Sequence, residues 1–158
     1  IQACDWSSDV CSSDLGLLHD VVEDCGVSLE SLEAQFGGRV AAIVDGCTDG
    51  VPDAQGHKPP WRERKEQYLA HLEQAHSDVL LVSACDKLHN ARAIVADLRT
   101  HGLTIFERFT AGQDGTTWYY RQLAGVFGRR LGHQTLVRLL EHEVGSLANP
   151  GLAGAAAI

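Results

Sequence analysis

The sequence predicts an all-α fold, a helical bundle that is not a coiled coil, and three observations lead to this prediction. Apolar residues recur at every third or fourth position from Gly16 onward, which is the spacing of one helix face. No segment shows the alternation of apolar and polar residues that marks a strand, and no internal repeat is found. With 158 residues, 44% of them hydrophobic, the chain has the size of one globular domain with a sizeable core.

The first two predicted helices are bounded by glycine and serine. A buried helix is expected from Gly16 to about Cys25, and Gly26 ends it because glycine tolerates the left-handed conformation beyond a helix C-terminus. Ser28 is the expected N-cap of the next helix, which stops before Gly37. The core-facing residues are Leu17, Leu18, Val21 and Val22 in the first helix, and Leu29, Leu32 and Phe36 in the second.

Two more helices flank a long loop. One runs from about Arg39 to Thr48, and the other from Trp61 to about Ala75 with a charged outer face. The segment between them, residues 49–60, is rich in Gly, Pro and Asp and is therefore predicted to be a loop. Their core-facing residues are Val40, Ile43 and Val44, then Trp61, Tyr68, Leu69 and Leu72.

The longest helix and two further helices complete the predicted bundle. Ser77 is the expected N-cap of a helix that runs to about His101, where Gly102 stops it. Two helical segments follow, at residues 116–127 and 133–147, and residues 148–158 are expected to fray.

Composition narrows the class of protein. No apolar run approaches the roughly 20 residues that a membrane span needs, and no secretory signal is visible, so we expect a cytoplasmic protein without a membrane partner. A formal charge of −8 argues against nucleic acid as a partner, because binding to phosphate backbones needs clustered Lys and Arg. The five cysteines lack zinc-site spacing and are expected to be reduced thiols.

The first fifteen residues differ from the rest of the chain. The stretch CDWSSDVCSSDL, residues 4–15, has no periodicity, and it corresponds to the translation of a common sequencing-library adapter. Our hypothesis is that residues 1–15 are a non-native segment joined to a truncated gene. Residues 16–147 are then the functional domain, without its first helix or helices, and residues 148–158 are the tail.

Polar residues inside apolar helices point to a site. His19 and Asp20 lie between apolar neighbours, where burying an unpaired carboxylate costs several kcal/mol. Asp86 lies in another apolar run, and Asn90 follows one turn later on the same face. Two such features in separate helices suggest one shared site.

A divalent cation reconciles these residues, because imidazole and carboxylate ligands together suit manganese, iron or related ions. Glu23 and Asp24 lie one turn beyond Asp20, close enough to activate or position a water molecule. The alternative interpretation of Glu23 and Asp24 is a solvated helix end, which the helix dipole mildly disfavours for acidic residues.

Four segments together resemble a known family. They are LLHDVVEDCGVSLESLEAQFG, VDGCTDG, WRERKEQYLAHL and VLLVSACDKLHNARAI. In this order they are similar to consecutive motifs of the HD hydrolase domain of the RelA/SpoT alarmone enzymes and their small single-domain relatives. The resemblance extends from Gly16 to about Tyr120, and it implies an all-α HD-domain bundle that hydrolyses guanosine 3′,5′-bis(diphosphate), a small nucleotide, at its 3′-pyrophosphate.

The resemblance also implies roles for individual residues. It makes His19, Asp20 and Asp86 ligands of a divalent metal, usually Mn²⁺ in this family. The pair Glu23 and Asp24 matches the family's catalytic pair that supports attack by water. The candidates for substrate binding are Asn90, which matches a nucleoside-contacting residue, with Lys87 and Arg92 on the same helix and Arg62, Arg64 and Lys65 as phosphate partners.

One ligand of the family pattern is missing. The family supplies a further histidine from a helix upstream, whereas this chain has no histidine before His19. The adapter-like segment occupies that stretch, so we expect three metal ligands of four here, and impaired metal binding.

Several alternatives remain open at this point. The Arg62–Glu66 stretch is equally well read as a solvated helix surface with ion pairs, and Trp118, Tyr119 and Tyr120 are expected to close a core. The function could also be that of an HD phosphohydrolase with another nucleotide or phosphate ester as its substrate. A non-catalytic helical module that binds an alarmone or a partner protein is the third alternative.

Overall fold

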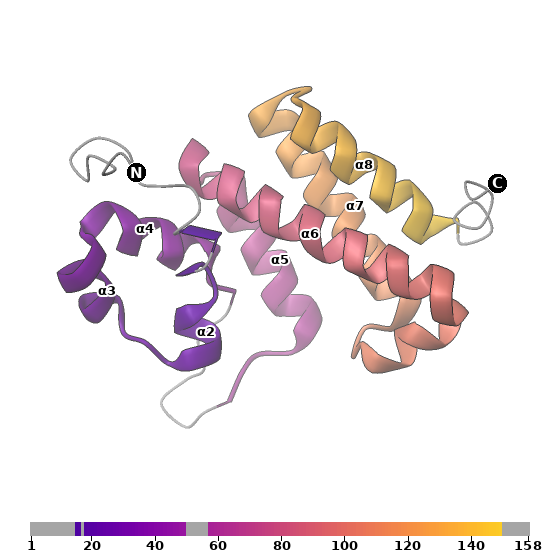
Figure 1. Ribbon diagram of the computed structural model, residues 1–158, viewed down its shortest axis with the longest axis horizontal. Helices are drawn as coiled ribbons and strands as arrows, with labels where there is room; N and C mark the ends of the chain where they lie inside the picture. The colour runs from indigo at the N-terminus through magenta and orange to yellow at the C-terminus, as the bar shows by residue number, and fades with distance from the viewer. Residues whose placement is uncertain (1–14, 17, 50–56, 150–158) are drawn as a thin grey trace, which may run out of the picture. The chain divides into compact units, whose positions relative to one another are not determined.

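The computed structural model describes residues 15, 16, 18–49 and 57–149, and all regular structure in those residues is helical (Figure 1). The predicted all-α class is confirmed. The chain divides into two compact units, Ile1–Lys58 and Pro59–Ile158. None of the helices in the described part of the chain combines the length and apolar character that a membrane crossing requires.

The first unit is built on a pair of packed helices. In it α3 and α4 pack against each other, and α4 buries most of its apolar residues. Ser28 caps α3 as predicted, since its hydroxyl oxygen accepts a hydrogen bond of 3.2 Å from the backbone N–H of Ser31. The described helices of this unit are α2 (Val21–Cys25), α3 (Leu29–Phe36) and α4 (Gly38–Cys47).

The first predicted helix is where the expectation was wrong. A turn at His19 and Asp20 interrupts the expected helix, and the part that follows it is the short helix α2. Helix α2 contains no buried residue. The His19 ring offers a physical reason, because its Nδ1 lies 2.9 Å from the Gly16 carbonyl oxygen and competes for a backbone acceptor. Gly26 ends α2 as predicted, in the left-handed conformation with φ 66°.

The second unit is organised around one long helix. α6 packs against α7, α8 and the 3₁₀ helix η1, while α7 also packs against α5 and α8. Figure 1 shows α7 and α8 side by side. The elements of this unit are α5 (Trp61–Leu72), α6 (Ser77–His101), η1 (Gly102–Arg108), α7 (Gly112–Leu131) and α8 (Thr135–Ala148).

Several predicted ends in this unit are corrected. α5 ends at Leu72 rather than Ala75, because the Arg130 guanidinium donates hydrogen bonds to the Glu73 and Ala75 carbonyl oxygens and holds that segment outside the helix. His76 rather than Ser77 is the N-cap of α6, since its Nδ1 accepts from the backbone N–H of Asp78. Gly102 stops α6 as expected.

The helix predicted at 116–127 is longer at both ends, and η1 was not predicted at all. Four glycines within α7 lowered its expected length, but packing overrides their low helix propensity. At Gly115 a glycine is required, because an added Cβ would lie 2.6 Å from the Cβ of Ala111 and 3.7 Å from the Trp61 ring. The loop residues 50–56 and the tail residues 150–158 lie outside the described chain.

The cap at Ser28 gives a test of the first unit. We expect Ser28→Ala to lower the free energy of unfolding by about 1 kcal/mol, because the backbone N–H of Ser31 loses its acceptor. Urea unfolding measures the change. Ser28→Asp serves as the control and should keep wild-type stability, whereas equal losses in both variants would contradict the role of the cap.

Candidate functional site

His19 and Asp20 form a pair of candidate metal ligands in the first unit. The Nδ1 of His19 lies 2.9 Å from the Gly16 carbonyl oxygen and donates to it, so Nε2 is the ring nitrogen that can bind a proton or a metal ion. Nε2 lies 2.8 Å from the Oδ2 of Asp20. Two atoms that each offer a lone pair repel at this distance unless a proton or a metal ion lies between them. The pair is therefore chemically suited to hold a cation.

Glu23 and Asp24 lie at the far end of α2. Both are exposed, and the Glu23 carboxylate accepts a hydrogen bond of 3.0 Å from the ammonium group of Lys58. Lys58 was not among the predicted site residues, because it stands alone in the Gly- and Pro-rich segment and follows no helical period. The only feature of the sequence that sets Lys58 apart is the Pro59–Pro60 pair after it, because a proline restricts the backbone of the preceding residue to extended conformations.

Asp86 occupies the middle of α6 in the second unit, where it is part-buried. Its side chain is 9% exposed. Oδ2 lies 2.6 Å from the Lys87 ammonium, and Oδ1 accepts a hydrogen bond of 2.8 Å from the Asn90 amide. The predicted proximity of Asn90 is thus correct, and both oxygens have a charged or polar partner.

The surroundings of Lys87 keep it charged. Burial on its own lowers the pKa of an ammonium group, but interactions with Tyr119, Asp86 and Tyr68 outweigh it, and the pKa of Lys87 lies above its ordinary value. Burial raises the pKa of Tyr119, and it raises the pKa of Tyr120 to about 12. Both tyrosines are buried, which confirms their predicted place in the core.

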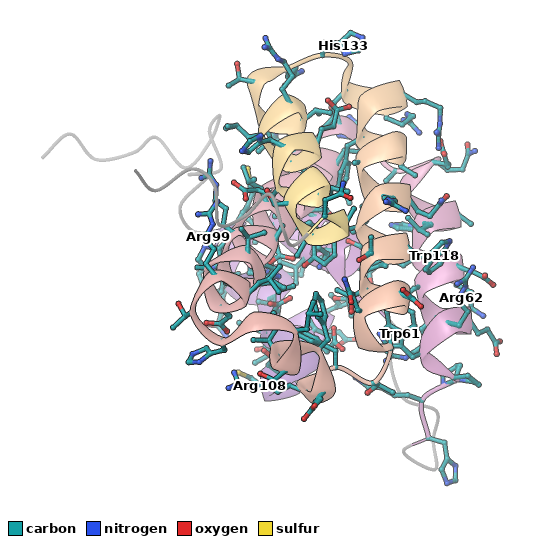
Figure 2. All side chains as sticks on the ribbon, turned by 90° about the vertical axis from the view of Figure 1, so that its right-hand side faces the viewer. Trp61, Arg62, Arg99, Arg108, Trp118 and His133 are labelled. Atoms are coloured by element: carbon teal, nitrogen blue, oxygen red, sulfur yellow. The ribbon has the colours of Figure 1, made fainter. Side chains whose placement is uncertain are left out.

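The basic residues expected to bind phosphates have partners within their own unit. Figure 2 shows Arg62 beside Trp118, with the guanidinium carbon 3.2 Å from the centre of the indole ring. Arg62 also pairs with Glu66 at 2.6 Å. Lys65 lies 4.9 Å above the ring of Tyr119, Arg92 pairs with Glu143 at 3.6 Å, and Arg64 is half-buried.

Each of the two units holds a group of the predicted site residues. His19 and Asp20 are in contact in the first unit, where Glu23 is paired with Lys58. In the second unit Asp86, Lys87 and Asn90 are in contact, and Arg62 and Lys65 are held on aromatic rings.

Comparison with known proteins gives a family match. The family model described as "HD domain" matches residues 5–117. A guanosine-3′,5′-bis(diphosphate) 3′-pyrophosphohydrolase, MESH1 from Danio rerio, is 41% identical over 76 residues, which are 48% of this chain and 39% of that protein. A guanosine-3′,5′-bis(diphosphate) 3′-pyrophosphohydrolase from Vibrio cholerae is 36% identical over 88 residues, 51% of this chain and 11% of that protein. The chain thus spans well under half the length of these relatives.

A solved structure supports the fold. The 1.85 Å crystal structure of lmo0812 from Listeria monocytogenes EGD-e superimposes with a TM-score of 0.71 and covers 84% of each chain at 22% sequence identity. At this identity the likeness concerns the fold alone.

The buried pair of Asp86 and Lys87 gives a stability test. Asp86→Ala leaves the Lys87 ammonium without its carboxylate, so we expect the free energy of unfolding to fall by about 3 kcal/mol. Chemical denaturation measures the loss. In the double variant Asp86→Ala/Lys87→Met we expect much of this stability to return, because no charge is left unpaired. A double variant less stable than the single one would refute this account.

Proposed function

This chain belongs to the HD domain family, and on that premise we propose that it is a metal-dependent phosphohydrolase that cleaves the 3′-pyrophosphate of guanosine 3′,5′-bis(diphosphate). The observation that carries the proposal is the 41% identity to a relative named for this hydrolysis. Water attacks the proximal phosphorus of the 3′-diphosphate and the bond from that phosphorus to the 3′-oxygen breaks. The nucleotide leaves with its 3′-oxygen protonated to a hydroxyl, and the attacked diphosphate is released as pyrophosphate.

We propose His19, Asp20 and Asp86 as ligands of a divalent metal, with Mn²⁺ as the preferred ion. The lone pairs of His19 Nε2 and Asp20 Oδ2 support the first two. Asp86 already faces Lys87 and Asn90, but a carboxylate has about four lone-pair sites, so it retains the capacity to bind an ion. When bound, the metal supplies positive charge that polarises the phosphate and lowers the pKa of water.

Proton transfer in this proposal belongs to α2. Glu23 accepts the proton of the attacking water, and Asp24, which follows it, helps to orient that water. The hydrogen bond from Lys58 supports this role, because it holds the Glu23 carboxylate in one orientation. Lys58 therefore acts as a positioning residue for Glu23.

Substrate binding is proposed for residues of the second unit. Asn90 would contact the nucleoside, and Lys87 provides a permanent positive charge close to Asp86. Arg62, Arg64, Lys65 and Arg92 are the proposed phosphate partners. Of these, Arg62 must exchange Glu66 for phosphate, since that carboxylate now occupies its Nε.

We also propose that residues 1–15 are not native and that the domain extends over residues 16–147. The similarity of residues 4–15 to the translation of a sequencing adapter supports this proposal. Sequencing the source locus across residue 15 tests it directly, and a continuous native reading frame through residues 4–15 would refute it.

Metal binding tests the ligand set without relying on activity. With the native N-terminus restored, we expect one tightly bound Mn²⁺ per chain, measured by the loss of the electron paramagnetic resonance signal of free Mn²⁺. His19→Ala and Asp86→Asn should each weaken binding by about tenfold or more. Glu63→Gln, on the exposed face of α5, is the control and should bind like the wild type. Unchanged affinity in both ligand variants would exclude this site.

Hydrolysis tests the substrate. The restored protein should release pyrophosphate from labelled guanosine 3′,5′-bis(diphosphate) in the presence of Mn²⁺, and Glu23→Gln should lower kcat by about 100-fold while metal binding persists. Glu63→Gln should leave kcat unchanged. Cleavage of other nucleotides without cleavage of this one would point instead to a different HD phosphohydrolase, and stoichiometric metal without any hydrolysis would contradict the proposed reaction.

A further inference from the structure

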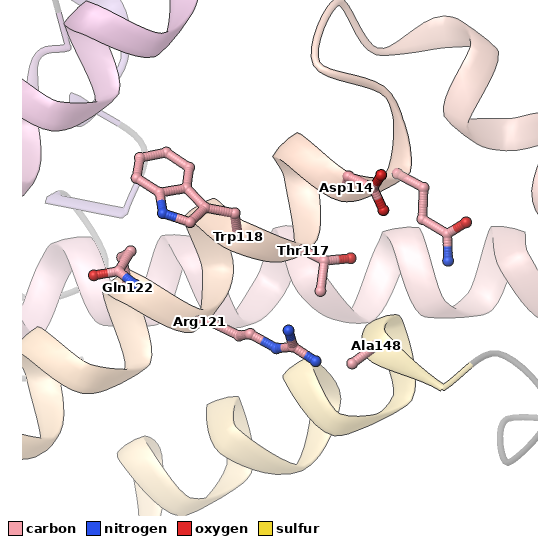
Figure 3. A pocket seen from close by; sticks show the side chains of 7 residues that line it. Asp114, Thr117, Trp118, Arg121, Gln122 and Ala148 are labelled. Atoms are coloured by element: carbon pink, nitrogen blue, oxygen red, sulfur yellow. The ribbon is translucent and has the colours of Figure 1, made fainter.

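A cavity of about 420 Å³ lies along α7 within the second unit (Figure 3). This volume falls in the range of small-molecule sites. None of its lining residues belongs to the proposed hydrolytic site. Ala148 at the end of α8 contributes one wall, and α7 contributes Gln113, Asp114, Thr117, Trp118, Arg121 and Gln122.

The cavity contains a buried hydroxyl without a partner. Thr117 is 7% exposed, and its Oγ1 makes no hydrogen bond with any described residue. In its neighbour Thr116, by contrast, the hydroxyl donates a hydrogen bond of 2.7 Å to the Gly112 carbonyl oxygen, as is usual for a buried threonine in a helix. A buried hydroxyl that lacks this bond costs free energy, so a partner from outside the chain would stabilise it.

The cavity also holds two opposite charges that do not neutralise each other. Arg121 and Asp114 form no ion pair with a described residue, whereas Arg129 and Arg130 on the same helix are both bonded to Glu73. Asp114 and Arg121 are seven residues apart, which separates them by roughly 10 Å along the axis of α7. Figure 3 shows the Arg121 guanidinium reaching toward Ala148 of α8, with Thr117 and Asp114 farther along α7.

The aromatic wall is held in place. One face of the Trp118 indole is covered by the Arg62 guanidinium, and Trp61 packs edge-on against it with ring centres 6.2 Å apart. The cavity therefore combines one fixed aromatic side chain with its two charges, which is the usual composition of a small-molecule site.

We propose that this cavity binds a small organic molecule that carries an anionic group at one end and N–H donors at the other. Arg121 pairs with the anionic group, which is a carboxylate or a phosphate, because the guanidinium fork matches either. Asp114 accepts the N–H donors about two helical turns away. Thr117 donates its hydroxyl to an acceptor between the two ends, and Trp118 covers the apolar part.

Two probes separate the two sources of the anionic group. L-Arginine carries a carboxylate and a guanidinium, and adenosine 5′-monophosphate carries a phosphate and an exocyclic amine on a planar base. Each is titrated into the full chain while the indole N–H resonance of Trp118 is followed by NMR. We expect a saturable shift with at least one probe, and the probe that produces it identifies a carboxylate or a phosphate ligand.

Variants link the shift to the cavity. Arg121→Gln and Asp114→Asn should each weaken the binding of that probe by about tenfold or more. Arg138→Gln is the matched control, since Arg138 is an exposed arginine of α8 outside the cavity, and it should bind like the wild type. The proposal is overturned if neither probe gives a saturable shift, or if Arg121→Gln and Arg138→Gln bind equally well.

Discussion

The second unit depends on a carboxylate in the middle of its longest helix. Asp86 lies on α6, the helix that packs against α7, α8 and η1, and its side chain is almost fully buried. An unpaired charge there would cost several kcal/mol, and the Lys87 ammonium and the Asn90 amide at its two oxygens offset this cost. The same ammonium lies 5.8 Å from the centre of the Tyr68 ring and interacts electrostatically with Tyr119, which joins α5 and α7 to this arrangement.

In the first unit, the polar residues of the proposed site are paired differently from Asp86. His19 and Asp20 are only partly buried, they interrupt a helix, and the two atoms that face each other both offer lone pairs. Such a pair contributes little to stability unless a proton or a metal ion joins it. A pair of residues that adds little to the stability of the fold is typical of a site that serves binding rather than folding.

The contacts of the basic residues cannot be read from their type alone. Arg62 stacks on Trp118 beside Glu66, and Lys65 lies over Tyr119. Arg121 was not singled out, but it is the arginine of α7 that has neither a hydrogen bond nor an ion pair with a described residue and that lines a cavity. Helical periodicity could not distinguish these cases, because the partners of Arg62 and Lys65 on α7 are more than fifty residues away in the sequence.

The sequence by itself determined the helical class, most helix positions and the buried carboxylate at Asp86, because each depends on local spacing of apolar residues, caps and glycines. Ser28, Gly26 and Gly102 act where local rules place them. Only the tertiary structure decided where α5 ends, how far α7 extends and which charged residues are paired. Arg130 reaches the carbonyls beyond Leu72, and Lys58 reaches Glu23 across 35 residues. Such contacts depend on how distant segments pack, and no local pattern records them.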